Sequence, residues 1–520
     1  MTENKRHILW VDDEIDLLRP HVIFLKEKGY DVATATNAED AIDMVKHNEF
    51  DLVLLDEMLH GMDGLTALNE MKDLRPGLPV IMVTKSEEES LMEEAIGSKI
   101  DDYLTKPVNP SQILLVCKKI LESKKIEGER ISRDYAKEFN QIATRIMEPL
   151  EWEDWVDIHF KLSQWDVELD SHPDLGLKQT LYNQKRDCNS EFGRFIERNY
   201  ESWMNSKKRP DLSPDIVSRF VLPHVKKGNK TVLLIFDNLR LDHWFVFEPL
   251  LRDYFRITRN YYCSLLPTAT PYSRNAIFAG LFPNEIEKLI PLLWREGSEE
   301  DDFSRNRYEH ELLEQQLVRI GVNLRPGPKY AKVLNNQEAD MLARKIQEYA
   351  DVPLSAIVIN FVDILAHTRS SSALIKEMIP NEAAFRAMTR SWFEHSHIYS
   401  ALRQLAENGN TIIITSDHGS IRGLRGTKVI GDRETSTSLR YKYGRNLKVN
   451  PKHAMIIKEP KNFNLPMRGV NTNYIIAKED YYFVYPTNYH YYLNYYADSF
   501  QHGGISLEEM VLPVITLEAR

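Results

Sequence analysis

The chain has 520 residues, 42% of them hydrophobic, which is too long for one core and indicates about two to four folded domains. The net charge of -11 argues against a broad nucleic-acid-binding surface, but not against a local basic pocket for a phosphorylated small molecule. The polar amino terminus lacks a signal-peptide profile and no apolar run reaches bilayer length, so we expect a cytoplasmic protein without membrane insertion. The three cysteines form no CxxC pair, which is typical of a reducing compartment, and any metal should be held mainly by His and Asp.

The first part of the chain alternates short apolar strands with amphipathic helices. In the stretch 38–47, Ala38, Ala41, Ile42 and Val45 fall on one helical face. About five such βα units in roughly 120 residues predict a flavodoxin-like doubly wound fold. The strands end at polar residues: Asp12 and Asp13, Asp56, Thr84, and, through DDYLTKP, Lys106.

Residues 1–122 resemble the receiver domains of two-component response regulators. An acyl phosphate would bring about two negative charges into this acidic pocket, so a divalent cation and an ammonium are needed beside it. The resemblance implies a cognate sensor histidine kinase. It also implies that Asp12, Asp13 and Asp56 hold Mg²⁺, that Asp56 is phosphorylated, and that Thr84, Tyr103 and Lys106 form the switch.

Two residues depart from the receiver pattern. His60 stands where receivers usually have proline, and Lys85 follows Thr84 where a small residue is common. We expect these departures to affect phosphate lifetime or switch geometry. The alternative is a receiver-like fold that is never phosphorylated.

A helical middle domain is predicted over residues 123–208. The stretches Asp134–Met147 and Cys188–Tyr200 are typical of helices, and NSKKRPDLSPD is the best linker candidate. Charged clusters here are most simply solvated helix faces. No helix-turn-helix with a basic face stands out, so specific DNA binding is not expected.

The third module, 209–520, again places polar residues after buried strands. The run TIIIT leads into Asp417 and His418, and a strand that ends in an acid at the sheet edge suits a metal site. The alternative is an Asp that caps a turn and a His that is only hydrogen-bonded. Similar positions are Asp237, Asp363 with His367 four residues later, and His502 before two glycines that leave room for metal or phosphate.

Thr270 is a candidate nucleophile. It precedes Pro271 at the predicted start of a helix that ends at Gly280, so we predict Thr270 as the N-cap and Pro271 as the first helical residue. A metal beside this hydroxyl would favour its alkoxide. The alternative is capping without catalysis. Arg274, one turn on, is expected either to supply charge to an oxyanion or to lie on the surface.

The donors can be divided between two cations. Asp237, Thr270, Asp417 and His418 can surround one ion, and Asp363, His367 and His502 a second. Three or four N/O ligands with open positions are typical of a catalytic zinc pair. The ordered set resembles the alkaline phosphatase superfamily, in particular its PglZ-type members. The resemblance implies two Zn²⁺ ions, Thr270 as nucleophile, and a metal-dependent phosphodiesterase or phosphatase.

Three further stretches leave alternatives open. Glu394, His395 and His397 are interpreted as surface or packing residues rather than a metal motif. The tyrosine-rich run 481–496 is interpreted as a β-hairpin, with nucleobase stacking as the alternative. The segment of about 284–350 is predicted to be a charged, helical insertion that forms a lid or determines specificity.

A receiver, a helical segment and a PglZ-type domain in this order resemble the PorX-like regulators of type IX secretion. The resemblance implies homodimerisation on phosphorylation. The leading hypothesis is a response regulator with a phosphorylation-controlled zinc phosphodiesterase that acts on nucleotides or short oligonucleotides, cyclic or linear. The alternative is a non-catalytic regulator that binds a sigma factor or secretion component through a zinc-stabilised domain.

Overall fold

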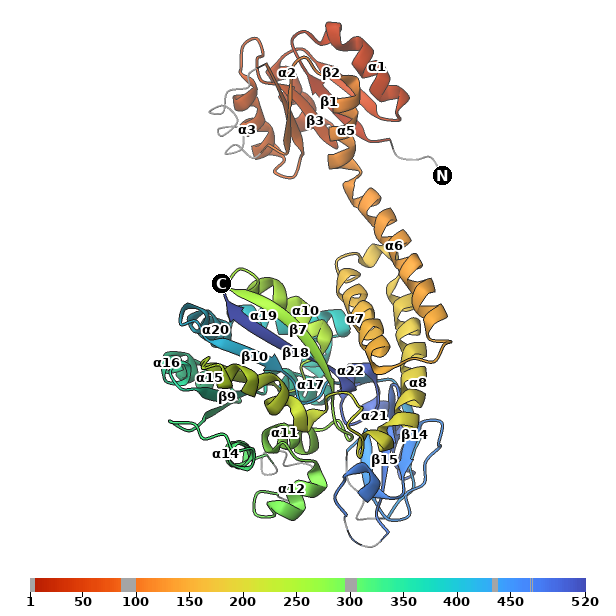
Figure 1. Ribbon diagram of the computed structural model, residues 1–520. Helices are drawn as coiled ribbons and strands as arrows, with labels where there is room; N and C mark the ends of the chain where they lie inside the picture. The colour runs from red at the N-terminus through yellow and green to blue at the C-terminus, as the bar shows by residue number, and fades with distance from the viewer. Residues whose placement is uncertain (1–4, 86–99, 295–305, 433–437, 468, 470) are drawn as a thin grey trace. The chain divides into compact units, whose positions relative to one another are not determined.

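The computed structural model describes residues 5–85, 100–294, 306–432, 438–467, 469 and 471–520 (Figure 1). The chain forms two compact units, Met1–Tyr135 and Ala136–Arg520, and each is considered by itself. In the described residues, none of the helices has the length and apolar content needed to cross a bilayer.

The first unit contains a parallel five-stranded sheet in the order β2-β1-β3-β4-β5. Its central strand β3 is buried at every position, because helices cover both faces of a parallel sheet. Separate apolar cores fill the two faces. This is the predicted flavodoxin-like fold. The elements are β1 (His7–Val11), α1 (Arg19–Glu27), β2 (Asp31–Ala35), α2 (Ala38–His47), β3 (Leu52–Asp56), α3 (Gly64–Leu74), β4 (Val80–Thr84), β5 (Asp102–Thr105) and α5 (Pro110–Leu121).

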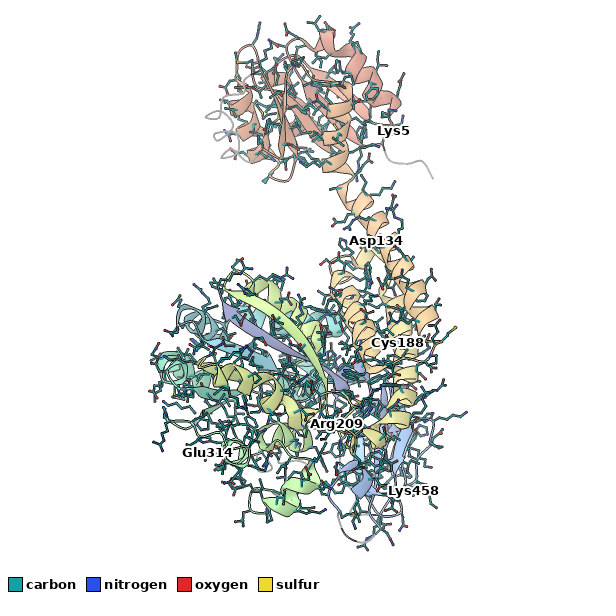
Figure 2. The ribbon with its side chains drawn as sticks, viewed as in Figure 1. Lys5, Asp134, Cys188, Arg209, Glu314 and Lys458 are labelled. Atoms are coloured by element: carbon teal, nitrogen blue, oxygen red, sulfur yellow. The ribbon has the colours of Figure 1, made fainter. Side chains whose placement is uncertain are left out.

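The middle region is helical, as predicted, and consists of α6 (Ser123–Arg145), α7 (Trp152–Glu168) and α8 (Lys178–Trp203). Figure 2 labels Asp134 on α6 and Cys188 on α8, the two helices that the sequence predicted in part. Helix α7 was not predicted as a helix. It packs through Trp155, whose ring meets Phe192 of α8 edge to face at 5.4 Å.

The carboxy-terminal α/β region (residues 209–520) is organised around a six-stranded sheet in the order β7-β18-β10-β6-β9-β8. Strands β10, β6, β9 and β8 are parallel, whereas β18 runs antiparallel to both β10 and β7. All residues of β6, β9 and β10 are buried, as expected for the middle of a covered sheet. The strands are β6 (Thr231–Phe236), β7 (Phe255–Cys263), β8 (Lys329–Val333), β9 (Leu354–Ile359), β10 (Thr411–Thr415) and β18 (Val511–Ala519).

Helices cover this sheet, and the main apolar core joins β6, β9 and β10 to α10, α15, α17, α19 and α20 (Figure 1). Phe236 of β6, Phe247 of α10 and Phe393 of α19 meet in this core, where Phe247 and Phe393 stack at 4.1 Å. The helices are α9 (Leu222–Lys226), α10 (Leu241–Leu251), α11 (Thr270–Ala279), α12 (Pro283–Leu289), α14 (Glu309–Arg319), α15 (Asn336–Arg344), α16 (Ile346–Ala350), α17 (Phe361–Ser371), α18 (Ala373–Met378), α19 (Glu382–His395), α20 (His397–Glu407), α21 (Tyr489–Tyr496) and α22 (Leu507–Met510).

Small sheets follow β10. Strand β11 (Ile421–Gly423) pairs with β17 (Ser499–Gln501), and β12 (Arg425–Lys428) pairs with β16 (Tyr481–Val484). A third sheet contains β13 (Tyr441–Gly444), β15 (Asn473–Ala477) and β14 (Ala454–Ile457).

Two interpretations of this region were wrong. The segment 284–350 is not a purely helical insertion, because it contributes β8 to the edge of the main sheet; its residues 295–305 lie outside the described part. The tyrosine run is not a β-hairpin, because only β16 is a strand and Tyr489–Tyr496 form helix α21. In the helix, rings four positions apart stack, as Tyr491 and Tyr495 do at 6.0 Å.

Candidate metal centre and phosphorylation site

The first group of candidate ligands lies at the carboxyl ends of two neighbouring strands. Asp237 follows β6, and Asp417 and His418 follow β10. The two strands are parallel and paired, so these ends meet at one edge of the sheet. One ligand atom from each side chain lies within 4.8 Å of the others, and all three residues are buried.

The second group contains Asp363, His367 and His502, whose ligand atoms also lie within 4.8 Å of one another. His502 Nε2 is 3.3 Å from His367 Nε2 and 3.8 Å from Asp363 Oδ1. Asp363 lies in the first turn of α17 rather than at the end of β9, which puts His367 one turn further on the same helix. The two groups are adjacent, because the rings of His418 and His502 stack at 4.1 Å.

Thr270 lies beside the first group. Its Oγ1 is 2.9 Å from His418 Nε2, and the residue is buried. Helix α11 begins at Thr270, with Ala269 in extended conformation as the N-cap, so the predicted cap position was wrong by one residue. The helix ends before Gly280 as predicted, where φ is +58°.

Burial and close charges perturb the first group strongly. Burial, together with the nearby Asp237, raises the pKa of Asp417 to about 7. Burial alone would raise the pKa of Asp237, but Arg274 and His418 outweigh it and hold that pKa below its usual value. Burial would lower the pKa of His418, yet Asp417 and Asp237 raise it. The site therefore favours added positive charge.

Arg274 is one source of that charge. The residue is 1% exposed, so the surface alternative was wrong. Its Nη1 donates to Asp237 Oδ2 at 2.6 Å and its Nε donates to Glu309 Oε1 at 2.6 Å. The guanidinium is thus engaged by carboxylates on two sides, and we assign it no bond to an oxyanion.

Glu309, Tyr330 and Lys332, which surround Arg274, were not predicted from the sequence as site residues. Glu309 of α14 is fully buried and also accepts a hydrogen bond from the Tyr330 hydroxyl. Lys332 Nζ of β8 lies 3.7 Å from Glu309 Oε2. Burial lowers the pKa of Lys332, although Glu309 opposes this shift.

The donor set fits zinc. Asp237 Oδ1 and both carboxylate oxygens of Asp417 are buried and accept no hydrogen bond among the described residues, which indicates a missing positive partner. Aspartate oxygen and imidazole nitrogen are common zinc ligands. A Cβ at Gly503 would lie 2.5 Å from Tyr441, and one at Gly504 would lie 2.2 Å from Arg440, so both glycines make room for these side chains. The predicted approach of metal or phosphate to the two glycines stays a prediction.

Four of the predicted receiver residues lie close together: Asp12, Asp13, Asp56 and Lys106. Ligand oxygens of Asp12, Asp13 and Asp56 lie within 4.8 Å of one another. Lys106 Nζ is 2.8 Å from Asp12 Oδ2 and 2.8 Å from Asp56 Oδ2. Burial raises the pKa of Asp56, although Lys106 opposes it. The Thr84 hydroxyl donates to Glu57, and Tyr103 is exposed on β5.

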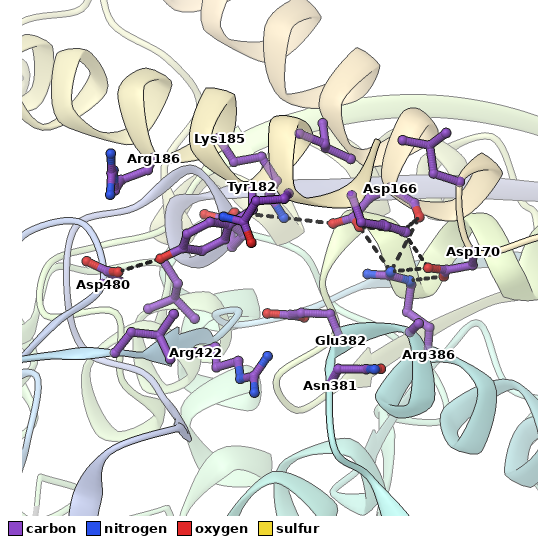
Figure 3. Close-up of a pocket in the computed structure, with 18 of the residues that line it drawn as sticks. Asp166, Asp170, Tyr182, Lys185, Arg186, Asn381, Glu382, Arg386, Arg422 and Asp480 are labelled. Atoms are coloured by element: carbon purple, nitrogen blue, oxygen red, sulfur yellow. Dashed lines mark hydrogen bonds and ion pairs between the residues drawn. The ribbon is translucent and has the colours of Figure 1, made fainter. Parts of the chain in front are cut away.

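A separate cavity of about 360 Å³ lies between α7, α8 and the α/β region, away from the residues of both metal groups (Figure 3). Its charges are largely paired within the protein. Arg386 donates to Asp166 and Asp170 of the middle region, and Lys185 lies 2.8 Å from Asp166. The Arg386 pairs join the middle region to the α/β region, whereas the Lys185–Asp166 pair joins α8 to α7.

The remaining histidine cluster lies outside the site. Glu394 and His395 are exposed at the end of α19, and His397 begins α20, as the surface interpretation requires. His395 Nδ1 hydrogen-bonds the Ser391 carbonyl.

The fold and the two sites define a response regulator with an alkaline phosphatase-like output domain. Residues 8–118 match the response regulator receiver domain, and residues 125–204 match the PorX response regulator linker domain. Residues 216–517, more than half of the chain, match the BREX system PglZ alkaline phosphatase-like domain. The chain belongs to this PglZ family, and its domain order is that of the predicted PorX-like architecture.

Individual relatives cover a smaller part. The alginate biosynthesis transcriptional regulatory protein AlgB of Pseudomonas syringae pv. tomato is 38% identical over 127 residues, which is 24% of this chain and 28% of that protein. PhoP of Bacillus subtilis is 34% identical over 125 residues, 24% of this chain and 51% of that protein. The chain thus spans about half or less of the length of these relatives. Among solved structures, a CheY-like response regulator receiver domain protein from Methanospirillum hungatei is 31% identical, with a TM-score of 0.23. The match covers 24% of this chain and 99% of that protein's chain.

Proposed function

We propose that this response regulator carries a zinc-dependent phosphodiesterase as its output domain, with nucleotides or short cyclic or linear oligonucleotides as substrates. One observation carries the proposal: the Thr270 hydroxyl lies 2.9 Å from His418 Nε2, beside two adjacent groups of metal-type ligands. Two donors at about 2.0–2.2 Å from one ion are about 3 Å apart, so this distance suits a shared cation.

The chemistry follows from these positions. Thr270 Oγ1 loses its proton and attacks phosphorus, and the bond from phosphorus to the leaving alcohol breaks as that oxygen takes up a proton. Water then attacks the phosphothreonine, the bond from phosphorus to Oγ1 breaks, and the phosphomonoester leaves while a proton from water restores the hydroxyl. Arg274 holds Asp237 so that its Oδ1 faces the site. Zinc, when bound, would polarise the phosphoryl oxygen and favour the threonine alkoxide. Asp237, Asp417, His418 and Thr270 would hold one ion, and Asp363, His367 and His502 the other.

Helix α21 supports a nucleotide substrate. It leads through β17 directly to His502, and Tyr491 and Tyr495 are 63% and 54% exposed. Five residues separate Tyr496 from His502, so their Cα atoms are at most about 20 Å apart along an extended chain. Nucleobases stack on exposed tyrosines while the phosphate lies at a cation.

Regulation is proposed to begin at Asp56. A cognate sensor histidine kinase would phosphorylate it, and the altered receiver surface would favour homodimerisation and change output activity in the control of type IX secretion. Lys106, already within 2.8 Å of Asp56, would neutralise part of the added charge.

The test compares bis-p-nitrophenyl phosphate, p-nitrophenyl phosphate and linear and cyclic dinucleotides as substrates of zinc-loaded protein. Thr270→Ala should lower kcat for diesters by at least about 10³-fold while zinc content stays the same. Thr258→Ala, an exposed threonine on β7, is the matched control and should match the wild type. Equal turnover by Thr270→Ala would remove Thr270 from the mechanism.

The same experiment addresses the alternative of a non-catalytic regulator. Zinc-loaded protein that hydrolyses none of these esters, yet binds a sigma factor or secretion component more tightly after treatment with acetyl phosphate, would favour that alternative.

A further inference from the structure

His60 distinguishes this receiver site from the expected pattern. It follows β3 by four residues, at the position where receivers usually carry proline. Its Nδ1 lies 2.7 Å from Asp13 Oδ2. The imidazole side chain is 91% exposed, whereas Asp13 is 19% exposed. An otherwise solvated ring thus lies directly against a candidate ligand of the receiver cation.

The pocket contains a buried carboxylate oxygen, Asp56 Oδ1, that is free to bind a cation. Asp56 is 2% exposed, and its Oδ1 accepts no hydrogen bond among the described residues. The other oxygen, Oδ2, accepts from Lys106, which also contacts Asp12. Asp13 and Asp56 Oδ1, which Lys106 does not contact, therefore remain as carboxylate ligands for an ion.

The spacing of His60 and Asp13 suits two neighbouring ligands of one ion. Donors bound at about 2.1 Å and nearly at right angles are about 3 Å apart. The observed 2.7 Å is close to this separation. The ring is exposed, so it can turn by a small rotation without disturbing the core.

We propose that His60 Nδ1 is a ligand of the receiver cation, together with Asp13 and Asp56. Carboxylates and water suit Mg²⁺, whereas an imidazole nitrogen favours divalent transition ions such as Co²⁺, Ni²⁺ and Zn²⁺. The receiver of this chain therefore binds such an ion more tightly than Mg²⁺ and can be phosphorylated with it. The inference concerns the receiver alone and does not depend on the proposed diesterase.

The first test counts metal in the full-length protein. Metal-free protein is loaded with Co²⁺, passed through a desalting column in excess Mg²⁺, and the retained Co²⁺ is measured. Wild type should retain one more Co²⁺ per chain than His60→Pro and His60→Gln. His47→Ala is the matched control, because His47 Nδ1 also lies near an aspartate, 3.3 Å from Asp43, but far from the cluster in sequence. The His47→Ala variant should retain as much Co²⁺ per chain as wild type.

The second test measures phosphorylation of Asp56 by acetyl phosphate at increasing Co²⁺ or Mg²⁺. In both His60 variants, the Co²⁺ concentration that gives half-maximal phosphorylation should rise at least about tenfold, equivalent to about 1.4 kcal/mol. The corresponding Mg²⁺ concentration should change by no more than about twofold. Equal Co²⁺ retention by wild type and both variants would overturn the proposal. So would an equal shift for both metals, since a histidine that only hydrogen-bonds Asp13 would affect the two ions alike.

Discussion

Replacing Arg274 by methionine tests how the metal-free site is held together. The guanidinium lies between Asp237 and Glu309 at 2.6 Å from each and 3.6 Å from Asp417, and all three carboxylates are buried. Methionine fills a similar volume but removes the cation beside Asp237 and Asp417 and leaves Glu309 with only Lys332, at 3.7 Å. Removing one partner of a buried, hydrogen-bonded ion pair costs about 3–5 kcal/mol, so Arg274→Met should lower the free energy of unfolding by about that amount in EDTA.

The assay is urea unfolding followed by circular dichroism, with and without zinc. The loss in free energy of unfolding caused by Arg274→Met should be smaller with zinc than in EDTA, because a bound cation beside Asp237 and Asp417 partly replaces the lost charge. Arg344→Met is the control, since Arg344 is 76% exposed in its pair with Asp340 and should lose at most about 1 kcal/mol. The double variant Arg274→Met/Glu309→Gln should lose less than the sum of the single variants. A loss below about 1 kcal/mol for Arg274→Met in EDTA would refute the reasoning.

Three further predictions concern other parts of the protein. Burial lowers the pKa of His159 to about 4, below the value of about 6.5 in the unfolded chain, so the native state binds fewer protons between these values and stability is lost as the pH falls from about 6.5 to 4. In urea titrations at several pH values, His159→Gln should reduce the loss of unfolding free energy between about pH 6.5 and 4 by up to about 3 kcal/mol, whereas the exposed His395→Gln should leave that loss unchanged. His502→Ala should lower the zinc content of the α/β region from two ions to one, measured by elemental analysis, and an unchanged content would exclude His502 as a ligand. Arg386→Met should speed amide hydrogen exchange in α7, because Arg386 joins Asp166 and Asp170 to the α/β region; exchange at the wild-type rate would show that these pairs do not fasten the helix.

Local patterns in the sequence were sufficient for much of the fold. Buried strands such as LVLLD and TIIIT predicted two separate sheets with parallel strands at their centres, because runs of apolar residues favour strands covered on both faces; the antiparallel strands β18 and β7 of the second sheet were not predicted. The order of acids and histidines at their ends predicted which side chains meet, since parallel strands share one carboxyl edge. The α/β class of the receiver and of the carboxy-terminal region could therefore be predicted from the sequence.

What the sequence did not predict depends on contacts between distant residues. Glu309 becomes part of the site only because α14 packs against α11 and brings it to Arg274, a pairing across 35 positions. Strand β8 is recognisable only once it pairs with β9. Tyr489–Tyr496 has the composition of a strand, but intrahelical ring stacking and its position after β16 favour a helix. The close contacts of Gly503 with Tyr441 and of Gly504 with Arg440 were not predicted, because these side chains lie more than 60 positions earlier in the chain.

The central claim is that two adjacent groups of side chains hold two cations within reach of Thr270. The most direct measurement is a crystal structure of the zinc-loaded protein with anomalous diffraction at the zinc edge. We predict one zinc peak among Asp237, Asp417 and His418, and a second among Asp363, His367 and His502, about 3.5–4 Å apart. Peaks elsewhere, or fully loaded protein with neither position occupied, would contradict the account.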